Sequence, residues 1–326
     1  MRTLKKIVFT GLFALIACAG VAQAQELYKD EKAPMHERIM DLLSRLTVEE
    51  KISLLRATSP GIPRLDIPKY YHGNEALHGV VRPGRFTVFP QAIGLAATWN
   101  PELQLQVATV ISDEARARWN ELEQGREQKK QFSDLLTFWS PTVNMARDPR
   151  WGRTPETYGE DPYLSGVMGT AFVKGLQGDD DRYLKIVSTP KHFAANNKET
   201  NRKDSDSRVS ERALREIYLK QFEIIVKEAD PWCIMSSYNI VNGHRTSENR
   251  ELLEDILRGE WNYQGMVTTD WWTSGEHYKE VKAGNDIKMA CGFPESLLRA
   301  KEAGVLTREE MEICAKRILG LILKID

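Results

Sequence analysis

The sequence predicts a parallel α/β protein, and specifically a single TIM-like (β/α)8 barrel. Short apolar runs that end in polar or charged residues alternate along the chain with segments of helical periodicity, which is the rhythm of a parallel α/β fold. The length fits as well, because the 326 residues less a 24-residue leader leave 302, with no Pro-, Ser- or Gly-rich linker to divide them.

The first 24 residues are typical of a secretory signal peptide. A basic start (MRTLKK) precedes an apolar run over 7–21 and the small-x-small cleavage site Ala22-Gln23-Ala24. This run is too short to span a membrane, and nothing later is apolar enough. A second interpretation stays open, because LIAC (15–18) resembles a lipoprotein cleavage box that would place a lipid on Cys18. We favour cleavage after residue 24 and expect an exported protein, periplasmic or secreted.

Composition excludes several function classes. The net charge of -1 argues against nucleic acid as the main partner, because phosphate binding requires a basic face. Beyond the leader the cysteines are Cys233, Cys291 and Cys314, which cannot all pair with one another and show no metal-ligand spacing. We interpret each of them as a small buried apolar residue, so the protein does not depend on a disulfide framework.

Capping signals mark the starts of four helices. Thr47-Val48-Glu49-Glu50 is a capping box ahead of an apolar face, and Ser210 opens a helix whose apolar face extends to Ile225. Asn249 caps the next helix. A second capping box at 307–310 leads into the last helix.

Five apolar runs are the candidate strands. In a barrel, the side chains at the carboxyl ends of the strands converge on one face, so the polar residues that close these runs are the candidate site. The runs are TVFPQAIGLAATWN, LTFWSPTVNMARD, LKIVSTPKHFAANN, WCIMSSYNIVNG and GMVTTDWW.

Two of the polar endings carry basic residues. Lys191 and His192 close the third run and offer several hydrogen-bond donors to a neutral polyol, although most such pairs are surface residues. The segment 146–166 holds three arginines, four acids and a tryptophan. We interpret most of this charge as an ion-pair network that shapes a loop, from which one arginine reaches a substrate hydroxyl.

Two carboxylates lie beside aromatic residues. Glu75 follows the pair Tyr70-Tyr71, and a carboxylate next to aromatic rings is a usual way to hold a sugar, although a helix-capping role explains Glu75 equally well. Asp270 ends the last run, directly before two tryptophans. Buried acids need partners, and Lys191, Arg147 or Arg202 could hold Asp270 ionised, as a nucleophile or general base requires.

These motifs, in this order, resemble glycoside hydrolase family 3, the group of β-glucosidases, β-xylosidases and related exo-acting enzymes. The resemblance begins near Leu46 and extends to the C-terminus. The stretches that carry it are GIPRLDIPKYYHGNEALHGV, FPQAIGLAATWN, FWSPTVNMARDPRWGRTPETYGEDPYLSG, KHFAANN, SERALREIYLKQFE, MSSYNIVNG, GMVTTDWW and AGNDIKM.

The resemblance implies roles around the scissile bond. Asp270 matches the family nucleophile, which forms the covalent glycosyl-enzyme, and Trp271 matches the aromatic residue next to it. Tyr238 matches a tyrosine near the nucleophile. Glu75 matches the acid that holds the sugar hydroxyls far from the scissile bond.

The same resemblance assigns the basic residues. Lys191 and His192 match the pair that binds sugar hydroxyls, and Arg202 matches a second subsite arginine. Arg147 matches the sugar-binding arginine of the RDPRWGR motif, whereas Arg153 is interpreted as part of the loop structure.

The implied reaction is retaining hydrolysis that releases terminal β-D-glucosyl residues from a β-linked oligosaccharide or glucoside. Retaining enzymes place two carboxyl groups about 5–5.5 Å apart, one as nucleophile and the other as acid and then base. No metal or organic cofactor is implied. A β-xylosidase stays open as the alternative, because it differs by one hydroxymethyl group in the pocket and no motif reports that difference.

The sequence departs from the family in its missing acid/base. Most two-domain members take this group from an α/β domain after the barrel, and this chain stops at RILGLILKID, so we expect one catalytic domain over 25–326. The N-acetylglucosaminidase branch uses an Asp/His pair after KHF, but AANNKETNRKDSDSR contains no histidine. Asp204 or Asp206 could replace the acid, although acids in a polar loop are more often solvent-facing.

Three explanations of the missing acid stay open. The chain is a fragment of a longer gene product, a separate polypeptide supplies the acid, or the protein is a catalytically silent barrel that binds sugar. The last helix is apolar on more than one face, so we also expect exposed apolar surface near 318–326 that would favour association.

Overall fold

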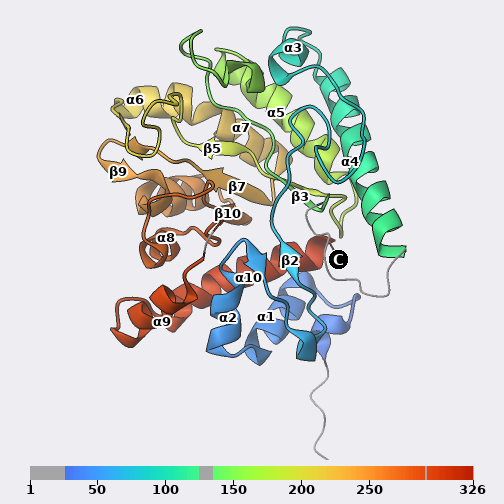
Figure 1. Ribbon diagram of the computed structural model, residues 1–326, viewed down its shortest axis with the longest axis vertical. Helices are drawn as coiled ribbons and strands as arrows, with labels where there is room; N and C mark the ends of the chain where they lie inside the picture. The colour runs from blue at the N-terminus through green and yellow to red at the C-terminus, as the bar shows by residue number, and fades with distance from the viewer. Residues whose placement is uncertain (1–25, 125–134, 291, 326) are drawn as a thin grey trace, which may run out of the picture.

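The computed structural model describes residues 26–124, 135–290 and 292–325 (Figure 1). The predicted leader, including Cys18, lies outside these residues. The helices are α1 (Met35–Arg45), α2 (Val48–Leu54), α3 (Ala92–Ala96), α4 (Pro101–Gln124), α5 (Pro162–Gln177), α6 (Glu211–Ala213), α7 (Lys220–Ala229), α8 (His277–Ala283), α9 (Pro294–Glu302) and α10 (Arg308–Ile325). Two π-helical segments cover Leu214–Tyr218 and Glu251–Glu260, and short 3-10 turns cover Leu27–Lys29, Pro63–Leu65, Thr154–Glu156 and Thr246–Glu248.

The four helix starts predicted from capping signals are confirmed. Both capping boxes form, at Thr47 with Glu50 and at Thr307 with Glu310. The Ser210 hydroxyl accepts from the Ala213 amide, and the Asn249 side chain accepts from the Leu252 amide. The segment after Asn249 is π-helical rather than α-helical.

The strands are short and belong to four small sheets. They are β1 (Thr58–Ser59), β2 (Tyr70–Tyr71), β3 (Thr137–Phe138), β4 (Val187–Ser188), β5 (Lys191–Phe193), β6 (Asp206–Ser207), β7 (Cys233–Ser236), β8 (Ile240–Val241), β9 (His244–Arg245) and β10 (Met266–Thr268). Parallel pairing joins β3 to β4, and β10 to β7 to β5. The antiparallel pairs are β1 with β2 and β8 with β9.

The parallel α/β class is confirmed, whereas no closed eight-stranded barrel is seen among the described residues. Four of the five apolar runs contain strands. The run TVFPQAIGLAATWN does not, because after Pro90 its Ala- and Leu-rich part forms α3 instead. Pro141 and Pro190 interrupt two further runs, since a proline cannot donate to a strand ladder.

The parallel sheet β10-β7-β5 brings the predicted site residues to one edge. Thr268 pairs with Met235, and Phe193 pairs with Ser236, so the carboxyl ends of the three strands are adjacent. The Ser236 hydroxyl also bonds the Thr268 carbonyl at 3.3 Å. Residues that follow these ends in the chain are therefore delivered to the same region.

The expected exposed apolar surface on the last helix is wrong for the described residues. Helix α10 crosses the molecule beside α1 and α2 in Figure 1. A Cβ added at Gly320 would lie 3.3 Å from Ile39 of α1, so the two helices approach closely there. Because these elements cover it on several sides, nearly all of its second half is buried: Ile318, Leu319, Gly320, Leu321, Ile322, Leu323 and Ile325.

The remaining expectations about the core are met in part. Cys233 and Cys314 are buried free thiols, as interpreted, while the Cys291 side chain lies outside the described part of the chain. Within that part, no helix combines the length and apolar character needed to cross a bilayer.

Because much of α10 is buried, shortening one of its buried side chains should destabilise the protein more than shortening an exposed one. Leu319→Ala should lower the free energy of unfolding by about 2–5 kcal/mol, because it removes a fully buried side chain and leaves a cavity. Ile313→Ala on the same helix is the matched control, since its side chain is 42% exposed, and should change this free energy by less than about 0.5 kcal/mol. Urea unfolding measures both. Equal midpoints for the two variants would contradict the packing of α10.

Candidate active site

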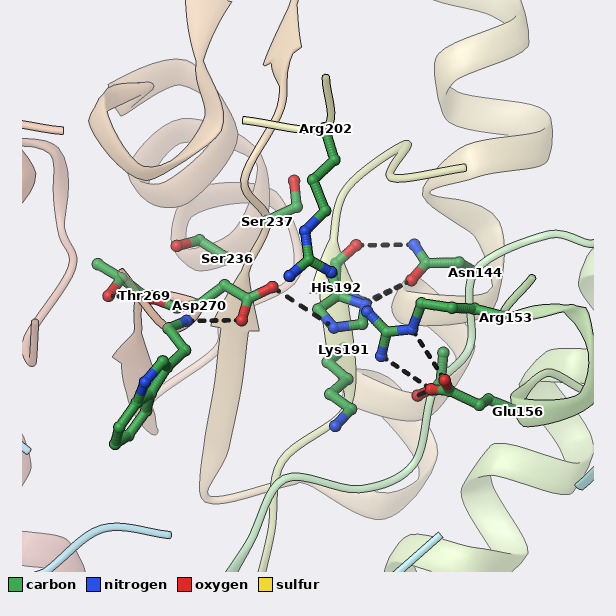
Figure 2. A network of polar contacts seen from close by, with 12 residues as sticks. Asn144, Arg153, Glu156, Lys191, His192, Arg202, Ser236, Ser237, Thr269 and Asp270 are labelled. Carbon is green, nitrogen blue, oxygen red and sulfur yellow. Dashed lines mark hydrogen bonds and ion pairs between the residues drawn. The ribbon is translucent and has the colours of Figure 1, made fainter. Parts of the chain in front are cut away.

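Asp270 lies in a mostly buried position just after β10. Asp270 is 7% exposed. The residue before it, Thr269, donates a hydrogen bond from its backbone amide to the Ile287 carbonyl at 2.9 Å. One carboxylate oxygen, Oδ1, accepts from the Trp271 amide at 2.6 Å. The other, Oδ2, has no hydrogen-bond partner among the described residues, and His192 Nε2 lies 3.5 Å from it (Figure 2).

Burial dominates the electrostatics of Asp270. Desolvation raises the pKa of this carboxyl to about 6, although the Trp271 amide and the positive charges of Lys191, Arg153 and Arg202 all act to lower it. The carboxylate is therefore mostly ionised at neutral pH, but its charged form is less stable than that of an exposed aspartate because it is desolvated.

His192 on β5 is held by Asn144 from the run that follows β3. Asn144 Oδ1 accepts from the His192 backbone amide at 2.8 Å and lies 2.9 Å from ring Nδ1, while the Asn144 amide donates to the His192 carbonyl at 2.9 Å. This orientation assigns the ring proton to Nδ1 and leaves Nε2 as an acceptor, on the side of Asp270. Burial lowers the pKa of His192 well below its ordinary value, and Arg153 and Lys191 add to this effect, so the ring is neutral.

Lys191 and Glu75, both predicted from the sequence, are brought together. The Lys191 ammonium donates to both carboxylate oxygens of Glu75, at 2.9 and 3.0 Å. Lys191 is almost fully buried, whereas part of Glu75 stays accessible. Glu75 lies in a segment without helical structure, so the alternative role as a helix cap is wrong.

The structure places two arginines differently from what the sequence indicated. Arg147 is exposed, and its guanidinium lies over the Tyr218 ring, 5.6 Å from the centroid, instead of beside Asp270. Arg153 has the electrostatic influence on Asp270, and its guanidinium forms a two-bond pair with Glu156 at 2.9 and 2.8 Å (Figure 2). Two successive turns separate the two arginines: the Trp151 amide bonds the Asp148 carbonyl at 3.0 Å, and the Thr154 amide bonds the Trp151 carbonyl at 3.1 Å.

Arg202 and Tyr238 form a second side of the site. The Arg202 guanidinium lies 4.5 Å from the centroid of the Tyr238 ring and bonds Glu199 at 2.9 Å. In Figure 2 it points toward Asp270 and His192. Burial raises the pKa of Tyr238, and the charge of Asp270 adds to this increase, which places the two side chains in one electrostatic environment.

An aromatic surface lies next to Asp270, as expected from the two tryptophans that follow it in the sequence. The Trp271 ring centroid is 5.5 Å from that of Trp139 and 6.4 Å from that of Trp272. Trp139 was not anticipated from the sequence. Its indole donates to the His72 carbonyl at 3.0 Å, and its ring fills the space where a Cβ on Gly73 would lie.

The two acids suggested as replacements for the missing group have structural partners. Asp204 pairs with Arg245 at 3.2 Å. Asp206 pairs with Arg208 at 3.1 Å and accepts from the Gly243 amide at 3.1 Å. Both carboxylates therefore have partners: that of Asp204 lies in β9, and those of Asp206 are its neighbour Arg208 and the turn before β9.

As a whole, the site can bind a polyhydroxylated ring and attack it. Cationic donors and a neutral imidazole acceptor surround one carboxylate whose Oδ2 makes no hydrogen bond, and an aromatic face lies beside it. Charged donors, a neutral acceptor and an aromatic face are the groups that bind sugar hydroxyls and C–H faces.

Comparisons with known proteins agree with this chemistry. The model of the "Glycosyl hydrolase family 3 N terminal domain" matches residues 44–321. "Beta-glucosidase A" of Butyrivibrio fibrisolvens is 50% identical over 226 residues, or 69% of this chain and 25% of that protein. "Xylan 1,4-beta-xylosidase" of Xylanibacter ruminicola is 38% identical over 94% of this chain and 38% of its own length.

A solved structure shares the fold over most of the chain. Beta-glucosidase 3B from Thermotoga neapolitana, in complex with alpha-D-glucose, aligns with a TM-score of 0.78 at 33% identity. The alignment covers 88% of this chain and 42% of that one. The chain thus spans less than half the length of each of these three proteins.

The site makes opposite predictions for its two contested arginines. Arg153→Met should raise the midpoint at which Asp270 titrates above its value of about 6, because a positive charge that favours the carboxylate is lost. Arg147→Met should leave that midpoint unchanged, since its guanidinium lies over Tyr218. Carbon-13 NMR of labelled aspartate carboxyls follows the titration. A shift with Arg147→Met and none with Arg153→Met would refute the assignment.

Proposed function

The chain belongs to glycosyl hydrolase family 3, and from that membership we propose that it is an exo-acting retaining β-glycosidase. Its substrate in this proposal is a terminal β-D-glucosyl residue of an oligosaccharide. One observation carries the proposal. Asp270 presents Oδ2, for which the described part of the chain offers no hydrogen-bond partner of normal geometry, beside the neutral His192 ring and directly before Trp271.

The proposed reaction has two displacement steps. Asp270 Oδ2 attacks the anomeric carbon and forms an ester to the sugar, while the glycosidic C–O bond breaks and the leaving oxygen takes a proton from a general acid. Water, activated by that same group, then attacks the anomeric carbon and releases the sugar and the Asp270 carboxylate. The burial that raises the pKa of Asp270 also keeps its charge poorly solvated, which favours attack.

The basic residues orient the sugar in this proposal. Lys191, Arg153 and Arg202 donate to hydroxyl groups, and Glu75 accepts from them. His192 Nε2 accepts from a hydroxyl, because Asn144 holds the ring proton on Nδ1. Each cation is also paired with a carboxylate, which keeps the surroundings of Asp270 close to neutral.

The proton donor is a group other than the carboxylates that surround Asp270. Glu75, Glu156 and Glu199 are each bonded to a cation of the site. Asp204 pairs with Arg245 of β9, and Asp206 pairs with Arg208. A carboxylate that is engaged in an ion pair must give up that pair before it can act as a proton donor. Substrates with activated leaving groups are therefore the ones that this chain should cleave best, since they need little proton donation.

The proposal also covers the architecture and the location of the protein. Isolated parallel bridges link Thr268 to Ile287 and Lys288 to Arg56, and these contacts support a barrel that continues past β10 toward the first strands. The leader over residues 1–24 supports export to the periplasm or beyond, with lipid attachment at Cys18 as the alternative. N-terminal sequencing of the mature protein distinguishes the two.

The preferred sugar has one specific alternative. Relatives carry the names beta-glucosidase and xylan 1,4-beta-xylosidase, so a xylosyl residue is the second candidate. The two sugars differ only in the hydroxymethyl group of glucose. Values of kcat/KM for matched aryl glucosides and xylosides decide between them.

Trapping of the covalent intermediate tests the proposal. Incubation with a 2-deoxy-2-fluoroglucoside that carries an activated leaving group should increase the intact mass by one fluoroglucosyl group, because this reagent forms the ester with little need for an acid. Peptide mapping should locate the adduct on Asp270. Asp270→Asn should show no adduct, since it lacks the carboxylate.

Two outcomes would count against the proposal. An adduct on any other residue would move the nucleophile elsewhere. If folded protein forms no adduct with either the glucose or the xylose reagent, that result favours the alternative of a catalytically silent sugar-binding protein.

A further inference from the structure

Trp272 is an exposed aromatic side chain two residues after Asp270. It is 53% exposed, whereas Asp270 is 7% exposed and His192 is 2% exposed. Its backbone has a φ of 61°, in the left-handed region that bulky residues rarely adopt. A residue keeps such a backbone conformation only where the surrounding structure holds it in place.

The loop after Asp270 is fixed by a buried ion pair. The Lys288 ammonium donates to the Thr273 hydroxyl at 3.0 Å and to the Gly275 carbonyl at 2.9 Å, and it pairs with Glu280 at 2.7 Å. Lys288 and Glu280 are each 1% exposed. Trp272 therefore lies between an anchored Thr273 and the Trp271 amide that bonds Asp270, so its outward position is imposed by the fold.

Three tryptophan rings are in contact one after another, and the last of them is exposed. Trp139 and Trp271 are partly buried and packed together, and Trp272 meets Trp271 at an interplanar angle of 87°. The exposed neighbours of Trp272 in its own loop, Ser274 and Glu276, are polar. A single aromatic face beside polar groups fits a sugar ring better than it fits an apolar protein surface.

We propose that Trp272 binds the sugar of the leaving group beyond the one next to the scissile bond. This inference rests on the proposed function, in which Asp270 attacks the terminal sugar. Because Asp270 and His192 are themselves almost fully buried, the rest of an oligosaccharide must extend toward solvent, and Trp272 is the exposed aromatic residue closest to Asp270 in the chain. The ligand class is a β-linked gluco- or xylo-oligosaccharide of three or more units.

Binding to an uncleaving variant tests the inference. In an Asp270→Asn background, calorimetry measures Kd for gluco- and xylo-oligosaccharides of two, three and four units. Trp272→Ala should raise Kd for the tri- and tetrasaccharide by about 10-fold, because one aromatic face that packs on a sugar ring is lost. The loss should be smaller for the disaccharide, and Trp272→Phe should recover part of the affinity.

Trp99→Ala is the matched control. Trp99 is also an exposed tryptophan, at 72%, and its φ of 55° is also left-handed, but it lies at the end of α3. This variant should bind every oligosaccharide as the parent does. Equal Kd values for Trp272→Ala and the parent at all lengths, with binding retained, would overturn the inference alone. If the parent binds no oligosaccharide and Asp270 is not trapped, the proposed function fails and the inference fails with it.

Discussion

The arrangement of the candidate site centres on the Asp270 carboxylate, which is buried away from water while nearby positive charges compensate only part of the cost of burial. Asp270 has Lys191, Arg153 and Arg202 in its electrostatic environment, yet each of these cations is bonded to a glutamate of its own, at positions 75, 156 and 199. The negative charges of these glutamates offset part of the positive potential at Asp270. Desolvation therefore determines the direction in which the pKa of Asp270 shifts. A carboxylate in this condition is ionised at neutral pH and gains stability when it forms a bond.

The fold supplies this environment through three adjacent strand ends and one anchored loop. β5 carries Lys191 and His192, β7 leads to Tyr238, and β10 leads to Asp270. Because the strands are parallel neighbours, a chain separation of about 80 residues becomes a distance of 3.5 Å between His192 Nε2 and Asp270 Oδ2. The buried pair of Lys288 and Glu280 then anchors the loop that follows Asp270, through Thr273 and Gly275.

Features that depend on local chemistry could be predicted from the sequence. Capping boxes predicted the helix starts, and strand ends predicted the convergence of Lys191, His192 and Asp270. Glu75 was assigned to the site by its aromatic neighbours and by the family resemblance, and it does contact Lys191. Features that depend on the path of a turn or on distant packing could not. Arg147 and Arg153 lie in one motif, and the local sequence does not tell which of them lies near Asp270 once the turns at 148–154 have formed.

Residues defined by their tertiary neighbours also escaped prediction. Asn144 acquires its role from His192, 48 positions later, and nothing in its local sequence marks it. In the same way, the apolar faces of α10 suggested an exposed surface, because the helices that cover it, such as α1, come from the other end of the chain.

The pH dependence of glycosyl-enzyme formation tests this account most directly. Rapid-quench measurement with an activated glycoside isolates the step in which Asp270 attacks. Since the attacking form is the carboxylate, a raised pKa means that the rate is lost as the pH falls, with a half-maximal rate near pH 6. A half-maximal rate near pH 4, where an ordinary exposed aspartate is half ionised, would contradict the claim that burial sets the reactivity of Asp270.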